Sequence, residues 1–169
     1  NNLNKITSIK SYHLFRLPTG TVIINIKERT PLASVIFPDR SAIVDADGYI
    51  LNHIPNLTLN VPDPADLPVI SGLSQNAERL DPQVTRVINN ILGQITTFVK
   101  AKRLQINLGG LESISLLVDD MLLVKLGTAA DLDRKMKVFE ALLPQVNGQW
   151  ERTQYLDVRF PNNPVILYK

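Results

Sequence analysis

Few residues of this chain have the types and spacing that catalysis or metal binding requires. The sequence has two histidines, His13 and His53, in different segments, and neither has a second histidine at helical spacing. An ordinary strand or loop position is therefore a simpler interpretation of each than a metal ligand or a general base. The absence of cysteine excludes thiolate metal sites, disulfides and thiol nucleophiles. We accordingly expect no catalytic residue, no metal site and no cofactor.

Two short acidic stretches are the remaining candidates for chemistry. Asp45, Asp47 and Gly48 resemble the start of a calcium loop, but the glycine stands in fourth place rather than sixth, and no glutamate occupies the twelfth. Asp119 and Asp120 form a carboxylate pair of the kind used in acid–base catalysis. A turn explains each stretch without further assumption. A carboxylate-dependent hydrolase is therefore kept only as an alternative function.

Composition limits the classes of protein to which the chain can belong. Its 169 residues suit one medium domain, or one domain plus a fragment of another, and a hydrophobic fraction of 44% with 20% charged residues is that of a folded globular protein. Eighteen basic and sixteen acidic residues give a net charge of +2, which is too balanced for a nucleic-acid platform. No apolar run approaches the roughly 20 residues that span a bilayer.

The first half of the chain has the patterns of short strands. Residues 6–17 and 22–29 are separated by a Pro-Thr-Gly turn and predict a hairpin, with Val22, Ile24 and Ile26 on one half-buried face. Residues 32–51 continue as short strands with turns between them, and the proline-rich residues 52–68 are expected to be irregular.

The second half contains two predicted helices between strands. Asp81 and Pro82 begin the first helix as N-cap and first helical residue, and apolar residues recur at helical spacing from 84 to 99. Thr128 and Asp131 resemble a capping box that opens a second helix, which Pro144 is expected to end.

The remaining segments of this half are predicted strands. They lie at 104–108, at 114–118 and 121–126 with Asp119 and Asp120 as the turn, at 154–160, and at 165–168. Together these elements predict an α+β fold, a mostly antiparallel curved sheet with both helices on one face.

Short motifs in a fixed order resemble the FtsQ/DivIB family of bacterial cell-division proteins. They are RLPTGTVIINIKERTPLA at 16–33, VDADG at 44–48, LPVISG at 67–72, VKLG at 124–127 and YLDVRFPNNPV at 155–165. The resemblance implies that residues 1–31 are the C-terminal remnant of a POTRA domain and that residues 32–169 form the family's β domain. It also implies a single-pass protein of the inner (plasma) membrane, anchored by a helix absent from this chain. This fragment would then lie on the periplasmic side at the division septum.

The same resemblance implies a function and a site. Family members are non-enzymatic scaffolds of the divisome that recruit small bitopic coiled-coil proteins of the FtsB/DivIC and FtsL type through a C-terminal sheet edge. A strand added at an exposed edge gains main-chain hydrogen bonds and side-chain specificity. Arg159 matches the family's binding arginine. The implied partner-binding residues are Tyr155, Asp157, Arg159, Phe160, Val165, Ile166, Leu167 and Tyr168.

Strand alternation refines this expectation. Leu156, Val158 and Phe160 should face the core or a partner groove, while Tyr155, Asp157 and Arg159 face the other way. The final strand is the favoured edge, because the chain ends there and Pro161 and Pro164 limit pairing at its start.

Other readings of the chain stay open. Asp157 and Arg159 have the spacing of a simple surface ion pair on one strand face, which would contribute little. A periplasmic polymer-binding module remains an alternative to the scaffold function.

Overall fold

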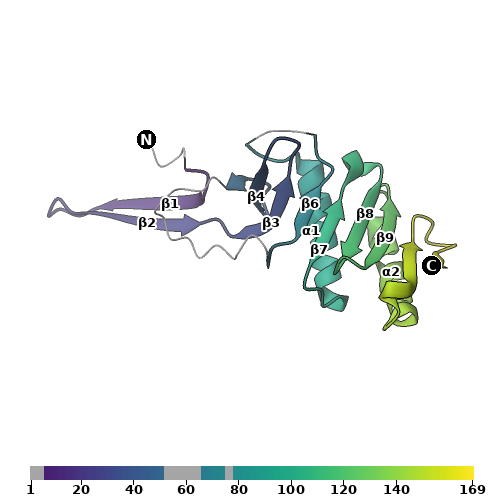
Figure 1. Ribbon diagram of the computed structural model, residues 1–169. Coiled ribbons are helices and arrows are strands. Elements are labelled where there is room, and N and C mark those ends of the chain that lie inside the picture. Colours follow the sequence, from purple (N-terminus) through teal and green to yellow (C-terminus); the bar gives the residue numbers. More distant parts are fainter. Residues whose placement is uncertain (1–5, 52–65, 75–77) are drawn as a thin grey trace.

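The computed structural model describes residues 6–51, 66–74 and 78–169, which form a projecting hairpin and one large sheet. The strands of the sheet lie in the order β11-β10-β9-β8-β7-β6-β3-β4-β5 (Figure 1). The hairpin consists of β1 (Ile9–Arg16) and β2 (Val22–Glu28), and the helices are α1 (Pro82–Phe98) and α2 (Leu132–Val146). The sheet strands are β3 (Pro31–Ile36), β4 (Ser41–Asp45), β5 (Ile50–Leu51), β6 (Val69–Ser71), β7 (Leu104–Asn107), β8 (Ile114–Val118), β9 (Leu122–Gly127), β10 (Thr153–Asp157) and β11 (Val165–Tyr168).

Most neighbouring strands are antiparallel, which confirms the predicted α+β class. The exceptions among the described strands are β6, which is parallel to both β3 and β7, and β10, which is parallel to β9. No strand is predicted from the sequence at Val69–Ser71. Three residues are too few to show a periodicity, and β6 is defined by its two neighbours in the centre of the sheet.

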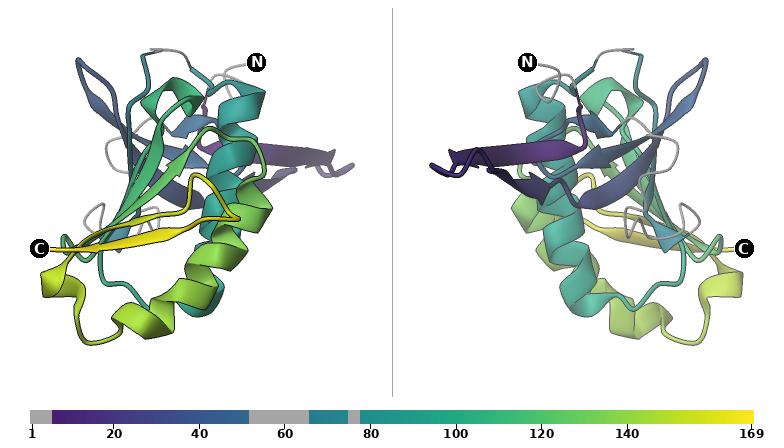
Figure 2. Two further views of the ribbon diagram at one scale, coloured as in Figure 1. Left: turned by 90° about the vertical axis from the view of Figure 1, so that its right-hand side faces the viewer. Right: turned by 90° about the vertical axis from the view of Figure 1, so that its left-hand side faces the viewer.

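Both helices lie on the same face of the sheet, as the sequence predicts (Figure 2). In α1 the buried stripe includes Ile88, Ile91 and Ile95, and the side chain of Asp81 accepts a hydrogen bond from the amide of Gln83 at 2.7 Å. That contact confirms Asp81 as the N-cap. Alternate residues of β6 to β10 complete the core and are fully buried: Ile70, Ile106, Leu116, Val124 and Leu156.

The predicted boundaries of α2 are wrong at both ends. Asp131 precedes the helix in a left-handed conformation (φ 52°) and makes no side-chain capping bond, so the capping box does not form. Pro144 lies inside the helix, which continues to Val146. A proline this close to the end removes only the hydrogen bond to the carbonyl of Glu140, and the fully buried Val146 holds the last turn against the core.

The hairpin between β8 and β9 forms as predicted. Asp119 (φ 50°) and Asp120 (φ 58°) have the positive φ that a type I′ turn requires, and the amide of Met121 donates to the carbonyl of Val118 at 3.0 Å. Of the two neighbouring apolar residues Leu123 and Val124, only Val124 faces the helices. Side chains alternate along a strand, so the burial of Val124 turns Leu123 to the open face, where it is half-buried.

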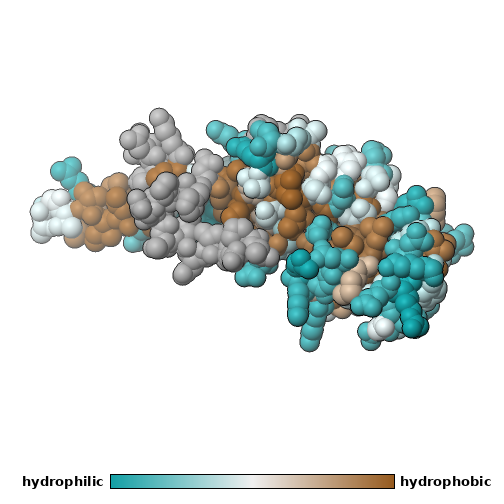
Figure 3. Space-filling model, in the orientation of Figure 1, coloured by the Kyte–Doolittle hydropathy of each residue, from teal (hydrophilic) through white to brown (hydrophobic). Residues whose placement is uncertain are grey.

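The β1–β2 hairpin projects away from the sheet (Figure 1). Its turn lies where it was predicted, and its first strand begins at Ile9, three residues later than predicted. Every residue of β2 is exposed, so the predicted half-buried face is not covered by the described part of the chain. Tyr12 and Ile26 are opposite each other, as are Leu14 and Ile24, and the hairpin carries a hydrophobic patch (Figure 3).

Gly48 provides a test of packing between the β4–β5 turn and α1. Its φ is +82°, and an added Cβ would clash with Oγ1 of Thr85. Gly148 has a similar φ of +74° with no atom near an added Cβ. We expect Gly148→Ala to cost about 1 kcal/mol of unfolding free energy through backbone strain alone. Gly48→Ala should cost clearly more, because Thr85 must also move. Urea unfolding of both variants measures the difference, and equal losses would contradict the contact.

Candidate functional site

The candidate site lies at the C-terminal end of the sheet. β10 is bonded on one side to β9 and on the other to β11, whereas β11 has no described neighbour beyond β10. The final strand is therefore the edge, as favoured from the sequence. β10 ends at Asp157, three residues earlier than predicted, because the chain then turns towards β11.

Asp157 and Arg159 form a forked ion pair within one chain segment. The Nε of Arg159 donates to both carboxylate oxygens of Asp157, at 2.9 and 3.0 Å, and one terminal nitrogen donates to Oδ2 at 2.6 Å. The backbone amide of Arg159 also donates to Oδ1 at 3.1 Å. These hydrogen bonds from Arg159, together with the charges of Arg159 and Lys125, hold the pKa of Asp157 below its usual value. The guanidinium is thus held in one orientation while remaining half exposed.

Residues of β9 support this pair from the neighbouring strand. Val158 is fully buried, and its amide donates to the carbonyl of Lys125 at 3.0 Å, so the chain stays against β9 after β10 has ended. The stem of Arg159 lies over Gly127, where a Cβ would come within 3.0 Å of its Cγ. The ammonium of Lys125 sits 3.5 Å from the ring centroid of Tyr155, a cation–π contact on the same face.

Lys125 and Gly127 belong to the site, although no sequence pattern predicts this role for them. Both lie in the VKLG motif, but the parallel pairing of β9 with β10 is what brings them beside Tyr155 and Arg159.

Apolar side chains are exposed along this end of the sheet. Phe160 is 68% exposed, so of its two predicted surroundings, the core and a partner groove, the structure excludes the core, whereas Leu156 and Val158 are buried as predicted. Ile166 packs partly against the core. The remaining residues of the implied site with exposed apolar side chains are Val165, Leu167 and Tyr168.

The acidic candidates for chemistry have structural contacts. Asp119 accepts the backbone amides of Lys102 and Arg103 at 2.7 and 2.8 Å, and Asp120 is bonded to Gln105 and Arg103. Asp45 and Asp47 contact Arg29. His13 is exposed on the hairpin opposite Asn25, and His53 lies outside the described residues. Within the part of the chain that the structure describes, no group of three or more acidic or histidine side chains could hold a metal ion.

The Asp157–Arg159 pair predicts a pH-dependent contribution to stability. Because the pKa of Asp157 is lowered from 3.8 in the folded state, its stabilisation is complete above about pH 4 and is lost as the pH falls through the lowered value. At about pH 7, Asp157→Asn should reduce the unfolding free energy by up to ~1 kcal/mol. The difference between the variant and the parent should shrink as the pH falls through the lowered pKa of Asp157. Denaturant unfolding over a series of pH values from neutral to acidic tests this, and a difference that does not change with pH would contradict it.

Comparison with known proteins supports a cell-division family. The family model for the C-terminal region of the cell-division protein FtsQ/DivIB matches residues 36–159, from the end of β3 to Arg159, and β11 lies beyond the match. Curated protein sequences give no significant match.

Among solved structures, the chain is similar to the major extracytoplasmic domain, in its trans isomer, of the bacterial cell-division protein DivIB from Geobacillus stearothermophilus. The identity is 13%, the match covers 73% of this chain and 98% of that one, and the TM-score is 0.36. Neither helix in the described part of this chain is long and apolar enough to cross a membrane. On the strength of the family match across most of its length, the chain belongs to the FtsQ/DivIB family of bacterial cell-division proteins.

Proposed function

We propose that this chain is a non-enzymatic scaffold of the bacterial division machinery that binds a partner by strand addition at β11. The observation that carries the proposal is that β11 is a terminal edge strand, bonded to β10 on one side only. A strand in that position leaves half of its backbone groups without a partner in the sheet.

The direction of the free backbone groups follows from the pairing. The amide of Lys169 donates to the carbonyl of Arg152, so it points toward the β10 side. Backbone groups alternate in direction along an antiparallel strand, which turns the amides of Tyr168 and Ile166 toward the free edge. An added strand would bond to these two residues.

The side chains around this edge suit a partner with its own apolar residues. Val165 and Leu167 lie opposite Asp157 and Tyr155, so they share the open face of the sheet with the Asp157–Arg159 pair. An added strand would cover these exposed side chains, and a large apolar residue such as Phe160 contributes most when it becomes buried.

Arg159 supplies the charged part of the proposed site. Its Nε and one terminal nitrogen are occupied by Asp157, which fixes the plane of the guanidinium. The remaining N–H groups are available for a partner carboxylate, and a pre-oriented fork loses little entropy on binding. In the isolated chain Asp157 and Arg159 form the surface pair that was the alternative interpretation, and that pair is compatible with this second contact.

Family membership guides the identity of the partner. We propose small bitopic coiled-coil division proteins of the FtsB/DivIC and FtsL type. Residues 1–31 are then the last part of a POTRA domain and residues 32–169 the β domain. We further propose that the intact protein is anchored in the plasma membrane with this region on the extracytoplasmic side at the septum. No contact among the described residues favours the polymer-binding alternative.

A proline at Tyr168 tests strand addition directly. Tyr168→Pro removes an amide that faces the free edge, and Tyr168→Ala is the matched control because it removes the same side chain and keeps the amide. One lost main-chain hydrogen bond corresponds to about 1 kcal/mol, or roughly fivefold weaker binding of Tyr168→Pro than of Tyr168→Ala. Calorimetric titration with the extracytoplasmic part of an FtsB/DivIC-type protein measures this. Equal affinities of two folded variants would refute strand addition at this edge.

Charge reversal at Arg159 tests the second contact. Arg159→Glu should weaken partner binding by about 2 kcal/mol or more, because repulsion replaces attraction at a desolvated pair. It also places two carboxylates together in the free protein, so we expect a small loss of stability. Arg159→Gln removes the charge without the repulsion and should lie between the parent and Arg159→Glu in affinity. Unchanged affinity in both variants would exclude Arg159 as an anchor.

A further inference from the structure

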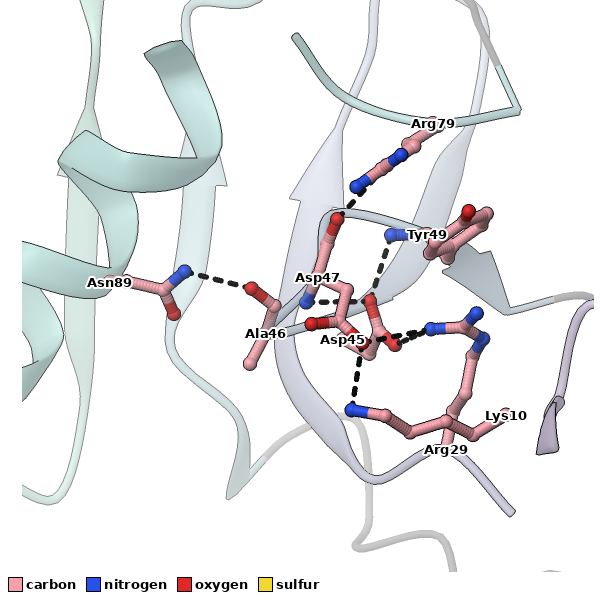
Figure 4. Close-up of polar contacts among 8 residues, drawn as sticks. All are labelled: Lys10, Arg29, Asp45, Ala46, Asp47, Tyr49, Arg79 and Asn89. Atoms are coloured by element: carbon pink, nitrogen blue, oxygen red, sulfur yellow. Dashed lines mark hydrogen bonds and ion pairs between the residues drawn. The ribbon is translucent and has the colours of Figure 1, made fainter. Parts of the chain in front are cut away.

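At the opposite end of the sheet, one turn contacts strand β1 of the projecting hairpin and the residue that directly follows β2. The turn consists of residues 45–49 between β4 and β5, and we name it the junction turn (Figure 4). Along the chain, β2 and β3 are separated only by Arg29 and Thr30. A two-residue connection by itself leaves the direction of a hairpin free, so any fixed direction must come from non-covalent contacts.

The inner contact is a buried ion pair. A terminal nitrogen of Arg29 lies 2.6 Å from Oδ2 of Asp45, and the two side chains are 10% and 4% exposed. The other oxygen of Asp45 accepts the backbone amides of Asp47 and Tyr49, at 3.0 and 2.8 Å. The hydrogen bonds within the turn thus hold the carboxylate in place independently of its contact with Arg29. A pair this well buried is little affected by dissolved salt.

The outer contact joins strand β1 of the hairpin to the same turn. The ammonium of Lys10, in β1, lies 2.8 Å from Oδ2 of Asp47, and the two side chains are 46% and 43% exposed. Arg29 also reaches that oxygen, at 3.2 Å. The hydrogen bond from Lys10 and the charges of Lys10 and Arg29 hold the pKa of Asp47 below its usual value. Because this contact is exposed, salt screens it.

The junction turn is itself fastened to the body of the protein. The side-chain amide of Asn89 in α1 donates to the carbonyl of Ala46 at 2.8 Å, and the amide of Leu80 donates to the carbonyl of Gly48 at 2.8 Å. The Nε of Arg79 donates to the carbonyl of Asp47 at 3.1 Å. The hairpin is therefore connected through the turn to α1, and α1 is packed on the sheet.

Tyr49 adds a stacked contact to the inner pair. The guanidinium carbon of Arg29 lies 3.7 Å from the ring centroid of Tyr49, and that of Arg79 lies 4.5 Å from it. Cation–π stacking fixes the plane of Arg29 while its end bonds to Asp45. The contacts with Asp45 and Tyr49 thus fix both the position and the orientation of Arg29, which directly follows β2.

We propose that the junction turn is an electrostatic latch with two parts that sets the direction of the β1–β2 hairpin relative to the sheet. The buried Arg29–Asp45 pair is the permanent part. The exposed Lys10–Asp47 pair is the part that releases as ionic strength rises. Two attachment points, one in β1 and one just after β2, prevent rotation that a single point would allow.

Distance measurements between spin labels test the latch. The sequence has no cysteine, so Thr19→Cys at the hairpin tip and Lys137→Cys on the exposed side of α2 give one labelled pair in an otherwise intact chain. Pulsed electron paramagnetic resonance then reports the spread of distances between them. Asp45→Asn retains the oxygen that accepts the turn amides while removing the charge that pairs with Arg29, and Lys10→Gln removes only the outer contact. Asp120→Asn, which loses an exposed pair with Arg103 elsewhere, is the control.

The expected order of the distance spreads is specific. The parent and Asp120→Asn should give the same narrow distribution, Lys10→Gln a broader one and Asp45→Asn the broadest. Raising the salt from about 0.05 M to about 1 M should broaden the parent to the width of Lys10→Gln and leave Lys10→Gln unchanged.

Two results would overturn the proposal. Control-like widths in both Lys10→Gln and Asp45→Asn would show that the junction turn does not set the direction of the hairpin. An equal salt response in the parent and Lys10→Gln would show that the outer pair is not the releasable part. Lys10 is exposed, so Lys10→Gln keeps the test valid even if Asp45→Asn unfolds the turn.

Discussion

Burial of alternate strand residues under α1 and α2 is the constraint on which the rest of the structure depends. Ile70, Ile106, Leu116, Val124 and Leu156 come from five neighbouring strands, and all are fully buried. A shift of any strand by one residue would turn its buried side chain to solvent, so the register of the whole sheet is fixed. The positions of the side chains on the open face, including Lys125, Tyr155 and Asp157, follow from that register.

Both helices pack on one face of the sheet, and among the described residues no helix lies beyond either end of it. The two ends differ in their contacts. At the β11 end, one side of the last strand has no described strand paired with its backbone, and exposed apolar side chains lie around this edge. At the other end, the junction turn between β4 and β5 is bonded to the hairpin, to α1 and to the segment at 78–80. An open edge suits recruitment of a partner, and a fastened junction suits control of direction.

One arginine–aspartate pair lies at each end of the sheet. The burial of each pair decides whether its arginine can still bind a further partner. Arg159 bonds to a carboxylate two residues away in its own segment and remains half exposed, so it retains capacity for another partner. Arg29 bonds to a carboxylate sixteen residues away and is almost completely buried, so its guanidinium is not accessible to an outside partner. Breaking a buried pair leaves an uncompensated charge, whereas breaking an exposed pair returns both groups to water.

The sequence by itself determined the features that depend on neighbouring residues. Asp81 and Pro82 begin α1, Asp119 and Asp120 form the turn between β8 and β9, and the final strand runs from 165 to 168, because caps, turns and short alternating runs act over a few residues. Family motifs likewise pointed to the division family before the fold was known. A motif match does not show, however, that Arg159 binds a partner.

Only the tertiary structure decided the features that depend on distant contacts. It made Val69–Ser71 a central strand, carried α2 past Pro144 by burying Val146, and turned Leu123 and Phe160 away from the core. It also joined Arg29 to Asp45 and placed Arg159 over Gly127. The physical reason is the same in each case. Burial and ion pairing depend on which segments meet in space, and local sequence patterns do not contain that information.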